Sequence, residues 1–157
     1  MSGNYDVQQV CENGHQITSS YRESPEQRQN YCDQCGAKTI TKCLNCNAEI
    51  RGYYSVPGVF SLGKTLVPSH CHNCGKAYPW TEKKIATAIQ IVTEFGDLSE
   101  EEKGTIEQDI NNIAKDIPQA ELSAMRIRRI WEQYGKIAYN VIMEFASKTA
   151  AEVLKSQ

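Results

Sequence analysis

Two Cys-x-x-Cys pairs lie close together in CDQCGAKTITKCLNCN, which spans residues 32–47. A further pair, CHNC, spans residues 71–74, and a Cys-x-x-x-His pair, CENGH, spans residues 11–15. Two intervening residues allow both sulfurs of a tight turn to face one ion, which is the ligand spacing typical of structural zinc sites. The chain therefore contains four candidate metal-binding turns, all in its first half.

The four turns together supply seven thiolates and one imidazole as candidate metal ligands: Cys11, His15, Cys32, Cys35, Cys43, Cys46, Cys71 and Cys74. A structural Zn(II) ion takes four nitrogen or sulfur ligands in a tetrahedron. Eight ligands fill two such sites and leave no cysteine over. We therefore predict two Zn(II) ions as cofactors.

The residue after the second cysteine of each Cys-x-x-Cys pair supports this interpretation. It is Gly36, Asn47 and Gly75 in the three pairs. A zinc-binding turn tends to need a left-handed backbone conformation at this position, and glycine and asparagine adopt that conformation most readily. We expect a positive φ angle at all three residues.

The order in which the turns pair is open. Sequential pairing joins the turns at 11–15 and 32–35 in one site and those at 43–46 and 71–74 in the other, as in two tandem zinc ribbons. A cross-braced arrangement joins the first turn to the third and the second to the fourth. We favour sequential pairing because each loop between paired turns then has a ribbon-like length. His70 and His72 flank Cys71 and are alternatives to His15 as the eighth ligand.

Other chemistries for the cysteines are less favoured. Four pairs without a surrounding thioredoxin-like pattern argue against redox catalysis. An iron-sulfur cluster uses the same thiolates, but the histidine ligand favours zinc. A catalytic zinc keeps an open coordination position, whereas both predicted sites are full. No other catalytic motif is found, so we predict no catalytic residues and no enzyme.

Four stretches of the chain together resemble an uncharacterised bacterial family, a domain of unknown function with predicted zinc ribbons. These stretches span residues 11–15, 32–40, 50–53 and 74–82. The helical half of the chain is similar to the family only loosely. The resemblance implies two zinc sites and a bacterial cytoplasmic origin, and it implies no activity.

Composition limits the remaining possibilities. At 157 residues the chain forms one ordinary domain or two small ones. Its apolar stretches are shorter than the ~18 residues that a membrane span needs, so no membrane association is expected. The N-terminus lacks the basic start and apolar core of a secretory signal, which predicts a cytoplasmic protein. Disulfides are then unexpected.

Residues 85–157 contain few Gly and Pro residues and show helical periodicity. We expect a helix over 81–95 capped by Thr81, a second over 99–117, and a third from about 119 to near the C-terminus. Ser99 and Glu102 have the spacing of a capping box. The core face of the third helix is predicted to include Leu122, Ile127, Trp131 and Tyr134, and a kink is possible at Gly135.

The predicted fold class is therefore α+β. A tandem zinc-ribbon domain of short β-hairpins spans residues 1–84, and a helical domain of about three helices spans residues 85–157. The helical domain is apolar on more than one face between residues 135 and 154, which predicts self-association or a partner helix.

These features indicate a non-enzymatic adaptor or regulatory protein that recognises partners through its zinc ribbons. The turn-rich, apolar loop over residues 47–70 is a candidate recognition loop. A nucleic-acid-binding regulator is the alternative. It is not favoured, because residues 1–84 carry only nine Lys and Arg against seven Asp and Glu, and the basic residues are scattered.

Overall fold

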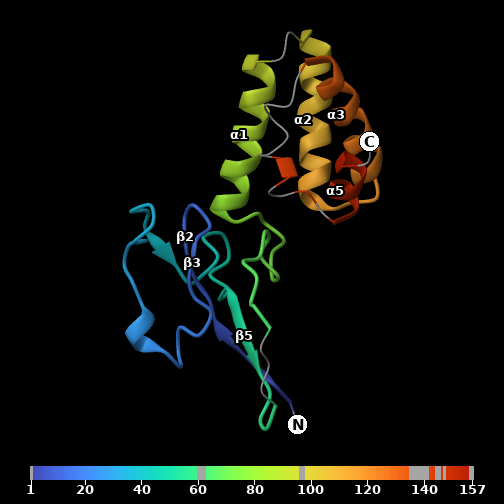
Figure 1. The fold of residues 1–157 in the computed structure, drawn as a ribbon. Coiled ribbons are helices and arrows are strands. Elements are labelled where there is room, and N and C mark those ends of the chain that lie inside the picture. The colour runs from blue at the N-terminus through green and yellow to red at the C-terminus, as the bar shows by residue number, and fades with distance from the viewer. Residues whose placement is uncertain are drawn as a thin grey trace. The chain divides into compact units, whose positions relative to one another are not determined.

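The computed structural model describes residues 2–59, 63–95, 98–134, 142–143, 146 and 148–155. The chain divides into two compact units, Met1–Trp80 and Thr81–Gln157. The first contains short antiparallel strands and the cysteine turns, and the second contains helices (Figure 1). The predicted α+β class is confirmed. No helix in the described part of the chain is both long enough and apolar enough to cross a bilayer.

The strands of the first unit form two small antiparallel sheets. β1 (Asn4–Val7) pairs with β5 (Arg51–Ser55), and β2 (Gln9–Cys11) lies between β3 (Gln16–Thr18) and β4 (Thr39–Ile40). A short 3-10 helix, η1 (Pro25–Gln27), follows β3. Cys11 is the last residue of the central strand β2 and is paired with Thr39 of β4. The sheet thereby fixes one candidate ligand directly.

The core of this unit includes the cysteine turns themselves. Cys43 and Cys71 are buried together with the apolar residues Val10, Ile50, Tyr78 and Trp80. The rings of Tyr78 and Trp80 stack with centroids 4.7 Å apart, and the Trp80 indole N–H donates to the Pro68 carbonyl over 2.9 Å. These two aromatic residues fill the core and are not available to a partner.

Loop 47–70 is attached to the strands by partly buried hydrogen bonds. Gln8 lies between β1 and β2 and is fully buried. Its amide donates to the carbonyls of Arg51 and Leu66, both over 3.2 Å. β5 passes so close to Ser19 that a Cβ atom at Gly52 would lie 2.1 Å from the Ser19 carbonyl oxygen, which explains the glycine. The loop still exposes Val59 and Leu66.

The first helix, α1 (Pro79–Phe95), begins earlier than expected. The expectation that Thr81 caps it is wrong, because Thr81 lies inside the helix and is buried. Pro79 is the first helical residue. Proline suits this position because its fixed φ angle is helical, and because a backbone N–H at the first position would have no partner within the helix.

The second helix, α2 (Glu100–Lys115), has the predicted start. The Ser99 hydroxyl accepts from the Glu102 backbone N–H over 3.3 Å, and the Glu102 carboxylate accepts from the Ser99 backbone N–H over 2.8 Å. The capping box is confirmed. The helix ends at Lys115, before Pro118, and the capping residue Asp116 adopts a left-handed conformation with φ of 51°.

The third predicted helix is not one continuous element. α3 (Ala120–Tyr134) and α5 (Lys148–Lys155) are separate helices, and Ala146 between them is not helical. The possible kink at Gly135 lies outside the described residues, as do the side chains of Trp131 and Tyr134. The described residues of the helical unit thus include three long helices and the short α5, and residues 142–143 are also helical.

The core of the helical unit joins residues from α1, α2, α3 and α5. Ala124 and Ile127 of α3 are buried in it, whereas Leu122 is 51% exposed, so the prediction that Leu122 faces the core is wrong. A buried polar group explains the change of face: the Ser123 hydroxyl donates to Asp109 of α2 over 2.7 Å. Ile142, Ala150 and Leu154 are buried in the same core, so they are not available to a partner.

Candidate metal centres

The three Cys-x-x-Cys turns have the same backbone hydrogen bonds. In each, the N–H that follows the second cysteine donates to the carbonyl of the first: Gly36 to Cys32, Asn47 to Cys43 and Gly75 to Cys71, over 2.7 to 2.9 Å. The N–H of each first cysteine donates over 2.8 Å to the carbonyl five residues later. The residues that flank each turn form a bridge, as Tyr31 does with Lys38. The turns are therefore three copies of one structural unit.

Each copy contains the predicted left-handed residue. The φ angles are 70° at Gly36, 59° at Asn47 and 72° at Gly75. This prediction is confirmed. The conformation turns the chain back on itself directly after the second cysteine, so that both sulfurs of the pair lie on the same side of the turn.

The first turn differs because it spans five residues, from Cys11 to His15, where the other turns span four. The N–H of Cys11 donates to the His15 carbonyl over 2.9 Å, and Gly14 has a φ angle of 91°. A Cβ atom at Gly14 would lie 2.9 Å from the Trp80 Cβ, so this turn packs against the aromatic core. Glycine is needed both for the φ angle and for the close approach.

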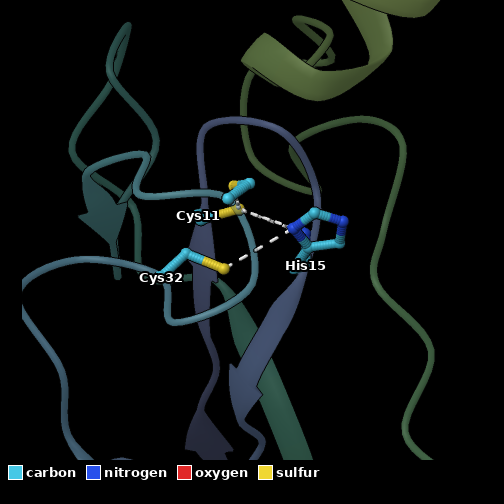
Figure 2. Close-up of side chains that lie close together, drawn as sticks. Cys11, His15 and Cys32 are labelled. Carbon is cyan, nitrogen blue, oxygen red and sulfur yellow. Dashed lines mark hydrogen bonds between the residues drawn. The ribbon is translucent and has the colours of Figure 1, made fainter.

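These turns bring Cys11, His15, Cys32 and Cys35 into one cluster. The Nδ1 atom of His15 lies 3.6 Å from the Cys11 sulfur and 3.5 Å from the Cys32 sulfur (Figure 2). The Cys11 and Cys35 sulfurs are 3.8 Å apart. Cys11 and Cys32 are buried, whereas Cys35 is exposed.

Cys43, Cys46, Cys71 and Cys74 form the second cluster. The sulfurs of Cys43 and Cys74 are 3.7 Å apart, and those of Cys46 and Cys71 are 3.6 Å apart. Cys43 and Cys71 are buried in the aromatic core, and the other two cysteines are half-buried. This cluster is more enclosed than the first.

The distances within both clusters fit a tetrahedral zinc ion. With Zn–S of about 2.3 Å and Zn–N of about 2.0 Å, tetrahedral geometry places two sulfurs about 3.8 Å apart and a sulfur and a nitrogen about 3.5 Å apart. The contacts of the preceding paragraphs match these spacings to within about 0.2 Å, the tolerance expected of a metal site. They are much longer than the ~2.05 Å of a disulfide bond, and all seven cysteines are free thiols.

The clusters follow the sequential pairing order. The first joins the turns at 11–15 and 32–35, and the second joins those at 43–46 and 71–74. His70 and His72 lie in neither cluster. His70 occupies the bridge position before the fourth turn, opposite Ala77, and His72 is exposed. Within the described residues, His15 is thus the imidazole placed among the thiols.

Sequence reasoning missed a set of asparagines around the sulfurs. The Asn13 amide donates to the Cys35 sulfur over 3.4 Å, and the Asn73 amide donates to the Cys46 sulfur over 3.6 Å. Asn45 forms the reciprocal bond to Cys74. Each asparagine occupies the second position after the first ligand of its own turn and bonds the last ligand of the partner turn. An asparagine recurs at this position in three of the four turns, and this recurrence is the feature of the sequence from which the bonds to sulfur could have been predicted.

Hydrogen bonds and burial shift the pKa values of the thiols in opposite directions. The backbone N–H of Ala37, followed by the Asn13 amide, lowers the pKa of Cys35 to about 6. Burial raises the pKa of Cys43 to about 11. Burial also opposes ionisation of Cys71, but the backbone N–H groups of Cys74 and Asn73 outweigh it and lower its pKa to about 6. Both clusters therefore include a sulfur that favours the thiolate form, which is the form that binds a metal.

The chain belongs to a family described as an uncharacterized protein conserved in bacteria (DUF2321), whose model matches residues 4–157. No curated protein and no solved structure matches the chain. The resemblance drawn from the cysteine-bearing stretches is confirmed, and the match extends through the helical half.

Proposed function

We propose that this protein is a non-enzymatic, zinc-binding adaptor of the cytoplasm, whose two zinc centres hold a recognition surface in shape. The observation that supports the proposal best is the pair of four-donor clusters with tetrahedral spacing. Three thiols with one imidazole, and four thiols, are donor sets typical of structural zinc. Soft thiolate ligands exclude magnesium and calcium, which prefer oxygen.

Both centres have the composition of closed sites. Each cluster supplies four protein donors, so a bound zinc ion keeps no open position for water or substrate. A zinc ion held in this way stabilises the fold. This argument supports a binding protein over a metalloenzyme.

The second centre is part of the core of the first unit. Cys43 and Cys71 pack with Val10, Ile50 and Tyr78, and the Tyr78 hydroxyl bonds to the Cys71 sulfur. Four thiols at this position repel one another once ionised, and a divalent ion removes this repulsion. We therefore expect the recognition surface to lose its shape when zinc is removed.

The proposal is tested by comparing the zinc-loaded protein with a C43S/C46S variant as bait in a bacterial lysate. We expect the zinc-loaded bait to retain defined proteins that withstand nuclease treatment and a rise from about 50 to about 200 mM salt. The variant should lose them. Retention that vanishes with nuclease, or that falls by orders of magnitude over this salt range, would instead identify a nucleic-acid-binding protein.

A further inference from the structure

We infer that a cleft between the second and third cysteine turns binds an acidic peptide segment of a partner protein that also carries an apolar side chain. The inference rests on the proposed adaptor function and specifies the chemistry of the partner. The cleft has a volume of about 460 Å³. Its walls come from Asn30 and Tyr31 before the second turn, the segment 38–42 between the turns, and Leu44 in the third turn.

The cleft is basic. Lys38 and Lys42 line it and are both exposed, and no acidic residue lines it. Neither lysine forms an ion pair with another residue in the described part of the chain. Glu49 lies opposite Lys42 in a bridge, but its carboxylate is engaged by Arg22 at 2.5 Å. The two ammonium groups are therefore available to carboxylates of a partner.

Two apolar side chains lie beside these charges. Tyr31 is 66% exposed and is paired with Lys38 in a bridge, and Leu44 is 67% exposed at the tip of its turn. Of the large apolar side chains that this unit exposes, Tyr31 and Leu44 are the ones that line the cleft. Aromatic residues are common anchors at interfaces. An apolar side chain of the partner can pack between them while flanking carboxylates reach the lysines.

Recognition at this cleft depends on side chains, because the backbone of the segment is already bonded. The Thr39 N–H donates to the Asn30 carbonyl over 3.2 Å, and the Thr41 carbonyl accepts from the Ile50 N–H over 2.9 Å. Strand addition by the partner would have to displace these bonds. The partner segment therefore does not need to be an extended strand.

A peptide fits this surface better than a nucleic acid. Two lysines neutralise few phosphates, and the whole chain has a formal charge of -2. A nucleic-acid site gathers more cations along a track, whereas one apolar anchor with a few flanking charges is typical of a short protein motif.

The test uses the zinc-loaded protein and short fluorescent peptides in which a central leucine is flanked by aspartates, asparagines or lysines. Fluorescence anisotropy should show binding of the aspartate peptide at least about tenfold tighter than that of the asparagine peptide. The K38E/K42E variant should lose this preference and bind the lysine peptide instead. K64E is the matched control, because Lys64 is exposed on the same unit and does not line the cleft.

Where a ligand binds, three outcomes overturn the inference: equal binding of the aspartate and asparagine peptides, an equal loss in K64E, or tighter binding of an oligothymidylate that depends on Lys38 and Lys42. The last outcome would assign the cleft to nucleic acid. If no peptide binds but the lysate proteins are still retained in a zinc-dependent manner, the cleft inference fails and the adaptor function stands. If the zinc-dependent retention also fails, both are wrong.

Discussion

Asn13, Asn45 and Asn73 are the residues that connect the cysteine turns of each cluster. Each donates an amide N–H to a sulfur of the partner turn, so each stabilises negative charge on a ligand and holds two turns in register. Groups that bond to metal ligands in this way orient the ligands and tune their basicity. The remaining turn, at residues 32–35, has Gln34 at the corresponding position, and Gln34 is exposed.

We predict that N45A and N73A each weaken zinc binding by about 10- to 100-fold, because each removes the side-chain amide donor of one thiolate. Competition with a chelator of known zinc affinity measures the change. Q34A is the matched control and should bind zinc as the parent protein does. Equal affinities for N45A, N73A and Q34A would show that the amides do not act on the metal.

Gly36 and Asn47 provide a second test at the level of single residues. A Cβ atom at Gly36 would touch nothing within 4 Å, so G36A should destabilise the zinc-loaded protein only through its φ angle, by about 1 to 2 kcal/mol. N47G at the matching position should be neutral or slightly stabilising. Thermal unfolding measures both. Unchanged stability of G36A would indicate that the left-handed conformation is not required.

The ligands and the left-handed residues were predictable because the turns are local. Each turn is closed by hydrogen bonds between residues that are near in sequence, so the residue types at fixed spacings determine its backbone geometry. The grouping of turns in space follows from the strands: β2 ends at Cys11 and pairs with β4, which follows the second turn. Sequence alone left this choice open because strand pairing is not local.

At the scale of the elements, the two clusters differ in exposure. Cys35 is exposed in the first cluster, whereas the second cluster lies against the aromatic core with no fully exposed cysteine. We predict that a chelator removes zinc from the first cluster before the second, because the thiolate of Cys35 is open to attack. Alkylation of cysteines during chelation, read by peptide mass spectrometry, should modify Cys32 and Cys35 earlier than Cys43 and Cys71. The reverse order would contradict this account.

The helices show where the pattern of apolar residues misleads. Ser99 predicts its helix start because the capping box is closed within four residues. Leu122 was assigned to the core because it is apolar, yet small Ala124 and polar Ser123 are buried instead. Asp109 is 1% exposed and takes the Ser123 hydroxyl as its partner across two helices. A hydrophobic pattern cannot reveal a buried polar pair between distant segments.

This reversed face gives a prediction about assembly. Leu122 and Met125 are both more than half exposed and lie one turn apart on α3, whereas Ile142 and Leu154 are buried. The sequence predicts self-association or a partner helix for this unit, and we propose self-association through the face of Leu122 and Met125. The double variant L122E/M125E should then be monomeric while the parent forms a dimer. Sedimentation velocity distinguishes the two. If L122E/M125E and the parent protein sediment with the same mass, the face of Leu122 and Met125 does not mediate self-association.

At the scale of the whole molecule, the two units have different roles. The first unit contains the two candidate metal centres and the basic cleft. The second unit has a helical core, and among its described residues Leu122 and Met125 are large, apolar and exposed. The proposed adaptor function requires a folded first unit, and we expect this unit to fold only when zinc is bound. Small units that bury little apolar surface usually need a bound metal or disulfide bonds to be stable.

Native mass spectrometry of the untagged protein, with and without a chelator, tests this dependence most directly. The account predicts two zinc ions on each chain, both removed by the chelator, with a shift to the highly charged ions of an unfolded first unit. One zinc ion per chain, an iron-sulfur cluster, or an unchanged charge distribution after metal removal would contradict it.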